Sequence, residues 1–257
     1  EDPEQYLWVG TDEGLARIGP DRQQHEHIGA EGPAPLDDQL INVIRPDRQG
    51  NLWVGTGRGL NGLQAADRRA GRYRFFSPPA DSLLRGRGVL SMLPVPRGPL
   101  LWVGTSRGLF ALDTNLQVQP SLRLGEGQPP AVQSLLLDRQ QRLWVGTDEG
   151  LMQVDATQRY LLPVKSQAAR LASVSVLALH QDREGYLWLG TEGEGLLRFD
   201  PAQGTLKAFT IEDGLPENFV YAIAEDEQGY LWLSTQNGLS KLRRNPDTGT
   251  LSFVNYG

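Results

Sequence analysis

Cysteine is absent from this 257-residue chain, and only two methionines and three histidines are present. The absence of cysteine excludes disulfides, thiol nucleophiles and zinc–thiolate sites. Long hydrophobic runs are also missing, because no apolar stretch reaches the roughly 18 residues that a membrane span needs. The sequence does not open with the charged and apolar segments of a signal peptide. These absences favour a chain that folds around an ordinary apolar core and makes no membrane contact of its own.

Positive charge is in short supply. Lysine and arginine number 25 against 31 aspartates and glutamates, which gives a formal charge of −6. Nucleic acids need a basic footprint for their phosphates, so we expect neither DNA nor RNA as a partner. His25 and His27 alternate along an expected outer strand, and a solvated strand face explains them better than a metal site. We therefore expect no metal and no cofactor.

What the sequence does contain is a repeat marked by tryptophan. Every tryptophan lies in a Leu-Trp-(Val/Leu)-(Gly/Ser)-Thr segment, and successive tryptophans are 42 to 49 residues apart. The six positions are Trp8, Trp53, Trp102, Trp144, Trp188 and Trp232. Six matches in register indicate a repeat architecture.

Each repeat is predicted to form four short strands. In the last repeat these are residues 219–226, 230–235, 239–242 and 251–255, which are rich in β-branched and aromatic residues, with a turn expected over 245–249. No window has the apolar spacing of a helix. A period of about 44 residues with four strands is typical of a β-propeller blade. We expect an all-β propeller of six four-stranded blades, forming a single domain over residues 1–257.

The repeating residues are predicted to be structural. A buried tryptophan would fill the space between adjacent blades, and the glycine two residues later would admit a close neighbour. The glycine of the following turn is expected to have a positive φ. These turn glycines are Gly14, Gly59, Gly108, Gly150, Gly195 and Gly238.

An aspartate stands six residues before five of the tryptophans. The positions are Asp2, Asp47, Asp138, Asp182 and Asp226, and the third repeat has Pro96 instead. An aspartate at the start of a turn accepts hydrogen bonds from backbone N–H groups two residues on. We expect each to hold its own turn, and we expect no calcium site because separate blades keep these carboxylates apart.

The pattern D-x-x-G-x-L-W-V-G-T-x-x-G-L resembles the two-component regulator propeller repeat, and the resemblance covers essentially the whole chain. That family forms extracytoplasmic sensor regions of bacterial receptors, ahead of a transmembrane helix and a histidine kinase or diguanylate cyclase. The resemblance implies a periplasmic or extracytoplasmic location and a homodimer formed through the parent receptor. Propellers similar to streptogramin lyases fit less well, because their chemistry needs a histidine in a cleft and only His180 lies on an expected innermost strand.

The two ends of the chain carry a further expectation. Residues 1–8 (EDPEQYLW) align without a gap with residues 225–232 (EDEQGYLW), so the first blade is expected to lack its innermost strand. The family usually has seven blades, often with two propellers in tandem. We therefore expect a fragment of a longer propeller, either seven-bladed or one of a tandem pair.

The turn after each Leu-Trp segment varies between repeats, and variable loops carry function on a constant scaffold. The candidate ligand-binding residues are Asp12, Glu13, Arg58, Arg107, Asp148, Glu149, Glu192, Glu194 and Asn237, with Tyr221 on an innermost strand. Repeats two and three offer arginines, whereas repeats one, four and five offer carboxylates. Such a two-signed face suits a small polar ligand, for example a saccharide, or a protein partner. Simple solvation of polar turns is the alternative.

No phosphate-binding loop or nucleophile elbow occurs, so no catalytic residue is assigned. The favoured hypothesis is a non-enzymatic sensor or interaction propeller in a bacterial signalling receptor. Two alternatives stay open. One is a propeller enzyme, a lyase or glycoside-processing enzyme that uses the acidic turn residues. The other is a structural docking scaffold.

Overall fold

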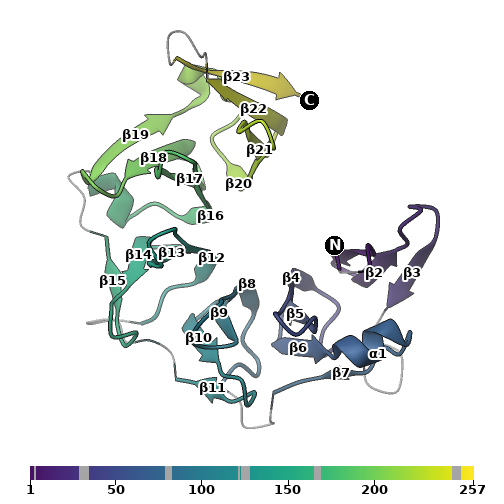
Figure 1. Cartoon of the computed structure of the whole chain (residues 1–257). Helices are drawn as coiled ribbons and strands as arrows, with labels where there is room; N and C mark the ends of the chain where they lie inside the picture. Colours follow the sequence, from purple (N-terminus) through teal and green to yellow (C-terminus); the bar gives the residue numbers. More distant parts are fainter. Residues whose placement is uncertain are drawn as a thin grey trace. The chain divides into compact units, whose positions relative to one another are not determined.

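Antiparallel sheets account for nearly all regular structure in the computed structural model, which describes residues 1–2, 4–28, 35–78, 83–120, 122, 128–164, 169–244 and 250–257. The described strands form one three-stranded sheet and five four-stranded sheets (Figure 1). The predicted all-β propeller architecture is confirmed, including a first blade of three strands. Contacts divide the chain into two compact units, residues 1–122 and 123–257, each with three blades. The turn expected over 245–249 lies outside the described residues.

Unit 1 contains blades 1 to 3. Blade 1 consists of β1 (Leu7–Thr11), β2 (Gly14–Ile18) and β3 (His25–Ile28). Blade 2 consists of β4 (Ile41–Pro46), β5 (Leu52–Thr56), β6 (Leu60–Leu63) and β7 (Phe75–Phe76), with helix α1 (Ala65–Arg69) between β6 and β7. Blade 3 consists of β8 (Val89–Pro94), β9 (Leu101–Thr105), β10 (Gly108–Leu112) and β11 (Val118–Gln119).

Unit 2 contains blades 4 to 6. Blade 4 consists of β12 (Val132–Leu137), β13 (Leu143–Thr147), β14 (Gly150–Val154) and β15 (Leu161–Pro163), followed by the 3-10 helix η1 (Ala169–Ala172). Blade 5 consists of β16 (Val176–Gln181), β17 (Leu187–Thr191), β18 (Leu196–Asp200) and β19 (Thr205–Phe209), followed by the 3-10 helix η2 (Ile211–Asp213). Blade 6 consists of β20 (Val220–Glu225), β21 (Leu231–Thr235), β22 (Gly238–Arg244) and β23 (Leu251–Tyr256).

The tryptophan of one blade packs against the next blade of the same unit. Trp53 belongs to one core cluster with Val89, the first residue of β8, and is fully buried. Trp188 belongs to a cluster with Val220, the first residue of β20. The predicted wedge between adjacent blades is therefore confirmed in both units. Burial of an indole supplies a large apolar area to each interface.

The glycine two residues after the tryptophan lies where two blades approach closely. A Cβ added at Gly55 would lie 2.6 Å from Cγ1 of Val89, and one at Gly190 would lie 2.6 Å from the carbonyl oxygen of Val220. Blade 6 has Ser234 at this position. Lack of a side chain is therefore needed at the blade interface, as the sequence predicted.

The aspartate turn is the hairpin turn that precedes the second strand of a blade. In blade 2, Asp47 Oδ1 accepts the N–H groups of Gln49 and Asn51 at 2.8 and 3.0 Å. Asp47 Oδ2 accepts the indole Nε1–H of Trp53 at 2.9 Å. The same indole bond, at 2.7 to 2.9 Å, joins Asp2 to Trp8, Asp138 to Trp144, Asp182 to Trp188 and Asp226 to Trp232. The backbone bonds were predicted from the sequence, whereas the bond that anchors the tryptophan was not.

These hydrogen bonds change the acidity of the turn carboxylates. Burial acts to raise the pKa of Asp226, but hydrogen bonds from its tryptophan and from the N–H of Tyr230, with the ammonium of Lys241, outweigh burial and lower the pKa to about 2. Burial opposes the change at Asp2 as well, yet its tryptophan, a backbone N–H and Arg68 lower the pKa of that carboxyl. Both carboxylates are therefore more readily ionised in the folded chain.

Two sequence expectations about local structure were wrong. Gly59 has no positive φ, whereas the other five turn glycines do. Lack of room for a side chain explains the glycine at position 59, because an added Cβ would lie 2.6 Å from Oδ2 of Asp37. No helix was expected, yet α1 forms between β6 and β7. At five residues it is too short for an apolar period to reveal it. No described helix is long and apolar enough to cross a bilayer.

Candidate functional site

A threonine and a glycine build every turn between the second and third strands. In blade 2, the Thr56 hydroxyl donates to the carbonyl oxygen of Gly59 at 3.2 Å and accepts the N–H of Arg58 at 3.2 Å. The corresponding threonine-to-glycine bond occurs in the other five blades, at 2.7 to 3.0 Å. The threonine and the glycine supply the hydrogen bonds that hold the turn. The side chains between them are therefore not needed for its structure and are free to vary.

In blades 2 to 5, the turn is tied to the loop that leads into the first strand of its own blade. The Gly57 N–H donates to the Leu40 carbonyl oxygen in unit 1, and the Glu192 N–H donates to the Ser175 carbonyl oxygen in unit 2, both at 3.0 Å. The equivalent bonds are Ser106 to Gly88 at 2.9 Å and Asp148 to Ala131 at 3.2 Å. Within each unit, the turns and these loops therefore share one end of the strands. We call this end the loop face.

Unit 1 contains four of the candidate residues, Asp12, Glu13, Arg58 and Arg107, and all four are exposed. Within the described part of the chain, none of them forms an ion pair. The Arg58 carbonyl oxygen accepts the Gly86 N–H at 2.7 Å, which joins the blade 2 turn to the loop that leads into blade 3. The side chains of both arginines thus stand on a fixed backbone while their charges face solvent.

A cavity of about 300 Å³ lies on the loop face of unit 1, beside the glycine that follows Arg58. The buried side chains of Leu60 and Leu84 line it, together with the polar groups of Asp37, Ser77 and Arg85. An apolar floor with a few convergent polar groups is typical of small-molecule sites. The three polar residues were not expected from the sequence, because they lie in loops away from the Leu-Trp segment that marks the repeat.

Asp37 holds a fixed position at this cavity. Its Oδ1 accepts the Asn61 side-chain amide at 2.6 Å and the Thr56 hydroxyl at 2.7 Å, and the hydroxyl shares that one proton with the more distant Gly59 carbonyl oxygen. The carboxylate is therefore joined to the same threonine that builds the turn. This contact connects the variable loop to the constant turn frame.

Unit 2 contains the remaining candidates, and it places carboxylates in two adjacent blades. Asp148, Glu149 and Glu192 are exposed, as is Asn237, whereas Glu194 is half-buried. The carboxylate of Asp148 accepts the Ala131 N–H at 2.8 Å. Of the two glutamates beside Gly193, only Glu192 is exposed.

The inserted Gly193 has φ +93° and serves a connection between blades. The N–H groups of Gly193 and Gly195 both donate to the Asn218 carbonyl oxygen, at 3.2 and 2.9 Å. Asn218 precedes β20, so the blade 5 turn is fixed to the loop that leads into blade 6. A bulge in β20 then follows between Val220 and Ala222.

Tyr221 is the residue at that bulge, and its side chain is 49% exposed. Bulges re-aim side chains at strand ends. Its ring centroid lies 6.5 Å from that of Phe219, which forms a bridge with Glu192. Phe219 therefore serves blade packing, and Tyr221 presents the free aromatic face.

His180 lies at the opposite end of its strand from the loop face. Its Nε2 lies 3.0 Å from Glu225 Oε2, and the other oxygen of Glu225 lies 3.0 Å from Arg183 Nε. The structure does not bring His180 together with the candidate turn residues of unit 2. It joins the first strands of blades 5 and 6 instead.

Comparison with known proteins finds a family match for four of the six repeats. The sequence profile of the two component regulator propeller family matches residues 35–58, 127–149, 170–193 and 214–237. The four matches end in the turns between the second and third strands of blades 2, 4, 5 and 6. Comparison with curated protein sequences gives no match.

Solved structures share the fold. The extracellular domain of the hybrid two component system BT3049 from B. thetaiotaomicron is 20% identical, with a TM-score of 0.60 over all of this chain and 40% of that domain. PorZ, a surface component of the type-IX secretion system of Porphyromonas gingivalis, is 17% identical, with a TM-score of 0.72 over 99% of this chain and 44% of PorZ. Virginiamycin B lyase from Staphylococcus aureus is 13% identical, with a TM-score of 0.71 over 99% of this chain and 82% of the lyase. The chain thus spans less than half the length of the two-component relative, and these identities establish the fold alone.

Proposed function

Because this chain carries repeats of the two component regulator propeller family, we propose that it is an extracytoplasmic sensor domain whose loop face binds a small polar ligand. One observation carries the proposal: an unchanging threonine–glycine frame holds exposed, variable side chains at one end of the strands in every blade. The family match and the likeness to an extracellular domain of a two component system support the same reading.

The ligand class follows from the charges at the loop face. In unit 1, Arg85 lines the cavity of about 300 Å³, and Arg58 stands beside the glycine that lines it. Arginine recognises carboxylates through paired N–H donors, and the hydroxyl groups of a sugar suit Asp37 and Ser77. An acidic saccharide such as a uronic acid combines these features.

The signal would pass to domains outside these residues. In this proposal a histidine kinase or diguanylate cyclase of the parent receptor reads the ligand-bound state, and dimers form through that receptor. A protein partner on the loop face is the alternative occupant. The charge of −6 argues against nucleic acid in either case.

Thermal stability in the presence of D-glucuronate tests the proposal. Binding to the folded state alone stabilises it by about 2.7 kcal/mol at a hundredfold excess over Kd, so the melting temperature should rise. Arg85→Gln should weaken the effect at least tenfold in apparent Kd. Arg97→Gln, an exposed arginine in the first hairpin turn of blade 3, is the matched control and should leave it unchanged. Equal losses in both variants, or no stabilisation by uronic acids, amino sugars and neutral sugars, would contradict the proposal.

The enzyme and the scaffold alternatives give different outcomes in the same experiment. An enzyme that uses the acidic turns would convert a glycan or lactone substrate, and Glu149→Gln or Glu192→Gln would abolish the turnover. A docking scaffold would show neither turnover nor stabilisation by any small molecule. The sensor proposal expects stabilisation without turnover.

A further inference from the structure

The aspartate turns differ in the second donor that reaches Oδ2. In four blades this oxygen accepts the indole N–H and one more nitrogen. The additional donors are Arg68 Nη1 on Asp2 at 2.5 Å, Asn51 Nδ2 on Asp47 at 2.9 Å, Arg142 Nε on Asp138 at 2.6 Å and Lys241 Nζ on Asp226 at 3.0 Å. In blade 5, Asp182 Oδ2 accepts Trp188 Nε1 at 2.7 Å, and no second donor from the described part of the chain reaches it.

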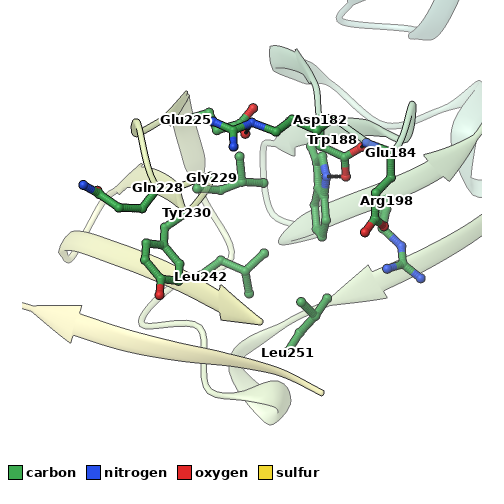
Figure 2. Close-up of a pocket in the computed structure, with 12 residues that line it drawn as sticks. Asp182, Glu184, Trp188, Arg198, Glu225, Gln228, Gly229, Tyr230, Leu242 and Leu251 are labelled. Atoms are coloured by element: carbon green, nitrogen blue, oxygen red, sulfur yellow. Dashed lines mark hydrogen bonds and ion pairs between the residues drawn. The ribbon is translucent and has the colours of Figure 1, made fainter. Parts of the chain in front are cut away.

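Asp182 instead lines a cavity of about 350 Å³ between blades 5 and 6. Figure 2 shows Trp188 and Arg198 on the blade 5 side of the cavity, and Tyr230 and Leu242 on the blade 6 side. The indole of Trp188 is 3% exposed and Leu242 is 4% exposed, so the walls of the cavity are firmly packed. The cavity is large enough for a small ligand.

The same position between blades 1 and 2 is already filled by a guanidinium group. Arg68, from α1 of blade 2, reaches across to Asp2 Oδ2 and Glu4 Oε2 of blade 1, and its Nη2 donates to the Gly50 carbonyl oxygen at 3.2 Å. Its side chain is 1% exposed. The repeat equivalents of these three acceptors are Asp182, Glu184 and Gly229, and all three line the cavity.

The arginines near the cavity are compatible with a bound cation. Arg198 lies over the Tyr186 ring, with the guanidinium carbon 4.6 Å from the centroid. Arg17, its equivalent in blade 1, lies over the Tyr6 ring at 3.4 Å and coexists there with Arg68. At the cavity, the charge of Arg183 is matched by Glu225 at 3.0 Å.

We propose that the cavity between blades 5 and 6 binds the guanidinium group of an arginine-like ligand. Asp182 Oδ2 and the Gly229 carbonyl oxygen accept its N–H groups, as Asp2 and Gly50 do for Arg68. The aliphatic stem packs against Leu231 and Leu242. Asp182 precedes β17, whereas the turn that contains Glu192 follows β17. The site therefore lies at the other end of the strand from the loop face.

Titration of the intact chain with agmatine tests the proposal, with the indole N–H resonances as the readout. The Trp188 resonance should move on agmatine binding, since its N–H shares the carboxylate oxygen with the ligand. N-carbamoylputrescine, which has the same length but a neutral urea group, should bind at least tenfold more weakly. An unmoved Trp188 resonance, or equal binding of the two compounds, would overturn the proposal.

Substitution of the carboxylate gives the second readout. Asp182→Asn should weaken agmatine binding at least tenfold, whereas Asp138→Asn, the same change at the turn filled by Arg142, should leave it within twofold. Equal losses in the two variants would contradict the assignment of the site. Arginine amide and acetyl-Gly-Arg-Gly-amide then distinguish the sources: similar affinities indicate a free small molecule, and tighter peptide binding indicates an arginine on a partner protein.

Discussion

At the scale of single residues, one carboxylate does two things in each aspartate turn. One oxygen caps the turn, and the other anchors the tryptophan that fills the next interface. The sequence predicted the first function because a turn aspartate is a local signal. It did not predict the second, because the aspartate and the tryptophan are six residues apart in sequence. Their side chains come into contact only when the hairpin forms.

Asp138→Ala should destabilise the chain by about 3 kcal/mol, because it leaves the buried indole N–H of Trp144 without its charged acceptor. Urea denaturation followed by tryptophan fluorescence measures the change. Asp155→Ala is the control, since that carboxylate holds an exposed turn and bonds no tryptophan. Equal losses at the two positions would show that the indole bond contributes nothing.

At the scale of the strand and turn, the repeat determines how closely blades stack. The strands and the packing of the tryptophan were predictable from alternation and from the Leu-Trp segment. Short elements were not predictable from these signals. Helix α1, for example, forms between the third and fourth strands of blade 2, in a segment that has no counterpart in the repeat pattern. The cavity beside Asp182 was equally hidden, because Asp182 belongs to the constant repeat and differs only in that no second donor from the described residues reaches its Oδ2.

Gly190→Ala should cost on the order of 2 kcal/mol, because the new methyl group meets the Val220 carbonyl oxygen of the next blade and the backbone must shift. The midpoint of urea denaturation is the measurement. Ser234→Ala changes the same position of blade 6, where the chain already carries a side chain, and should be nearly neutral. A neutral Gly190→Ala would mean that the blades do not pack this closely.

At the scale of the whole molecule, each repeat contains constant positions that form the fold and variable positions that carry the proposed ligand site. The positions that recur build the blades, and the turns of the loop face are among the positions that differ between repeats. The sequence therefore located the turns that could recognise a ligand. It could not show the cavity lined by Asp37 and Arg85, since those residues meet only when blade 2 and the loop of blade 3 come together.

The chain as a whole should lose stability in acid. The pKa of Asp226 is about 2 in the folded chain and is ordinarily 3.8, and that of Asp2 is lowered as well. The unfolded chain therefore binds more protons between these values. The stabilising contribution of these carboxylates is fully present above about pH 5 and is lost as the pH falls through 3.8 towards 2. Urea denaturation from pH 7 to pH 2.5 measures it, and Asp226→Asn should flatten the acid limb. An unchanged slope in that variant would contradict the assignment.

Hydrogen–deuterium exchange with and without D-glucuronate tests the central claim most directly, because it reports where along the chain a ligand acts. The account predicts slower exchange in the loop-face segments 35–40, 57–60 and 84–88, with the aspartate turn 47–51 unchanged. Protection confined to the aspartate turns, or no protection by any saccharide, would contradict the claim that the variable loop face is where this propeller recognises its ligand.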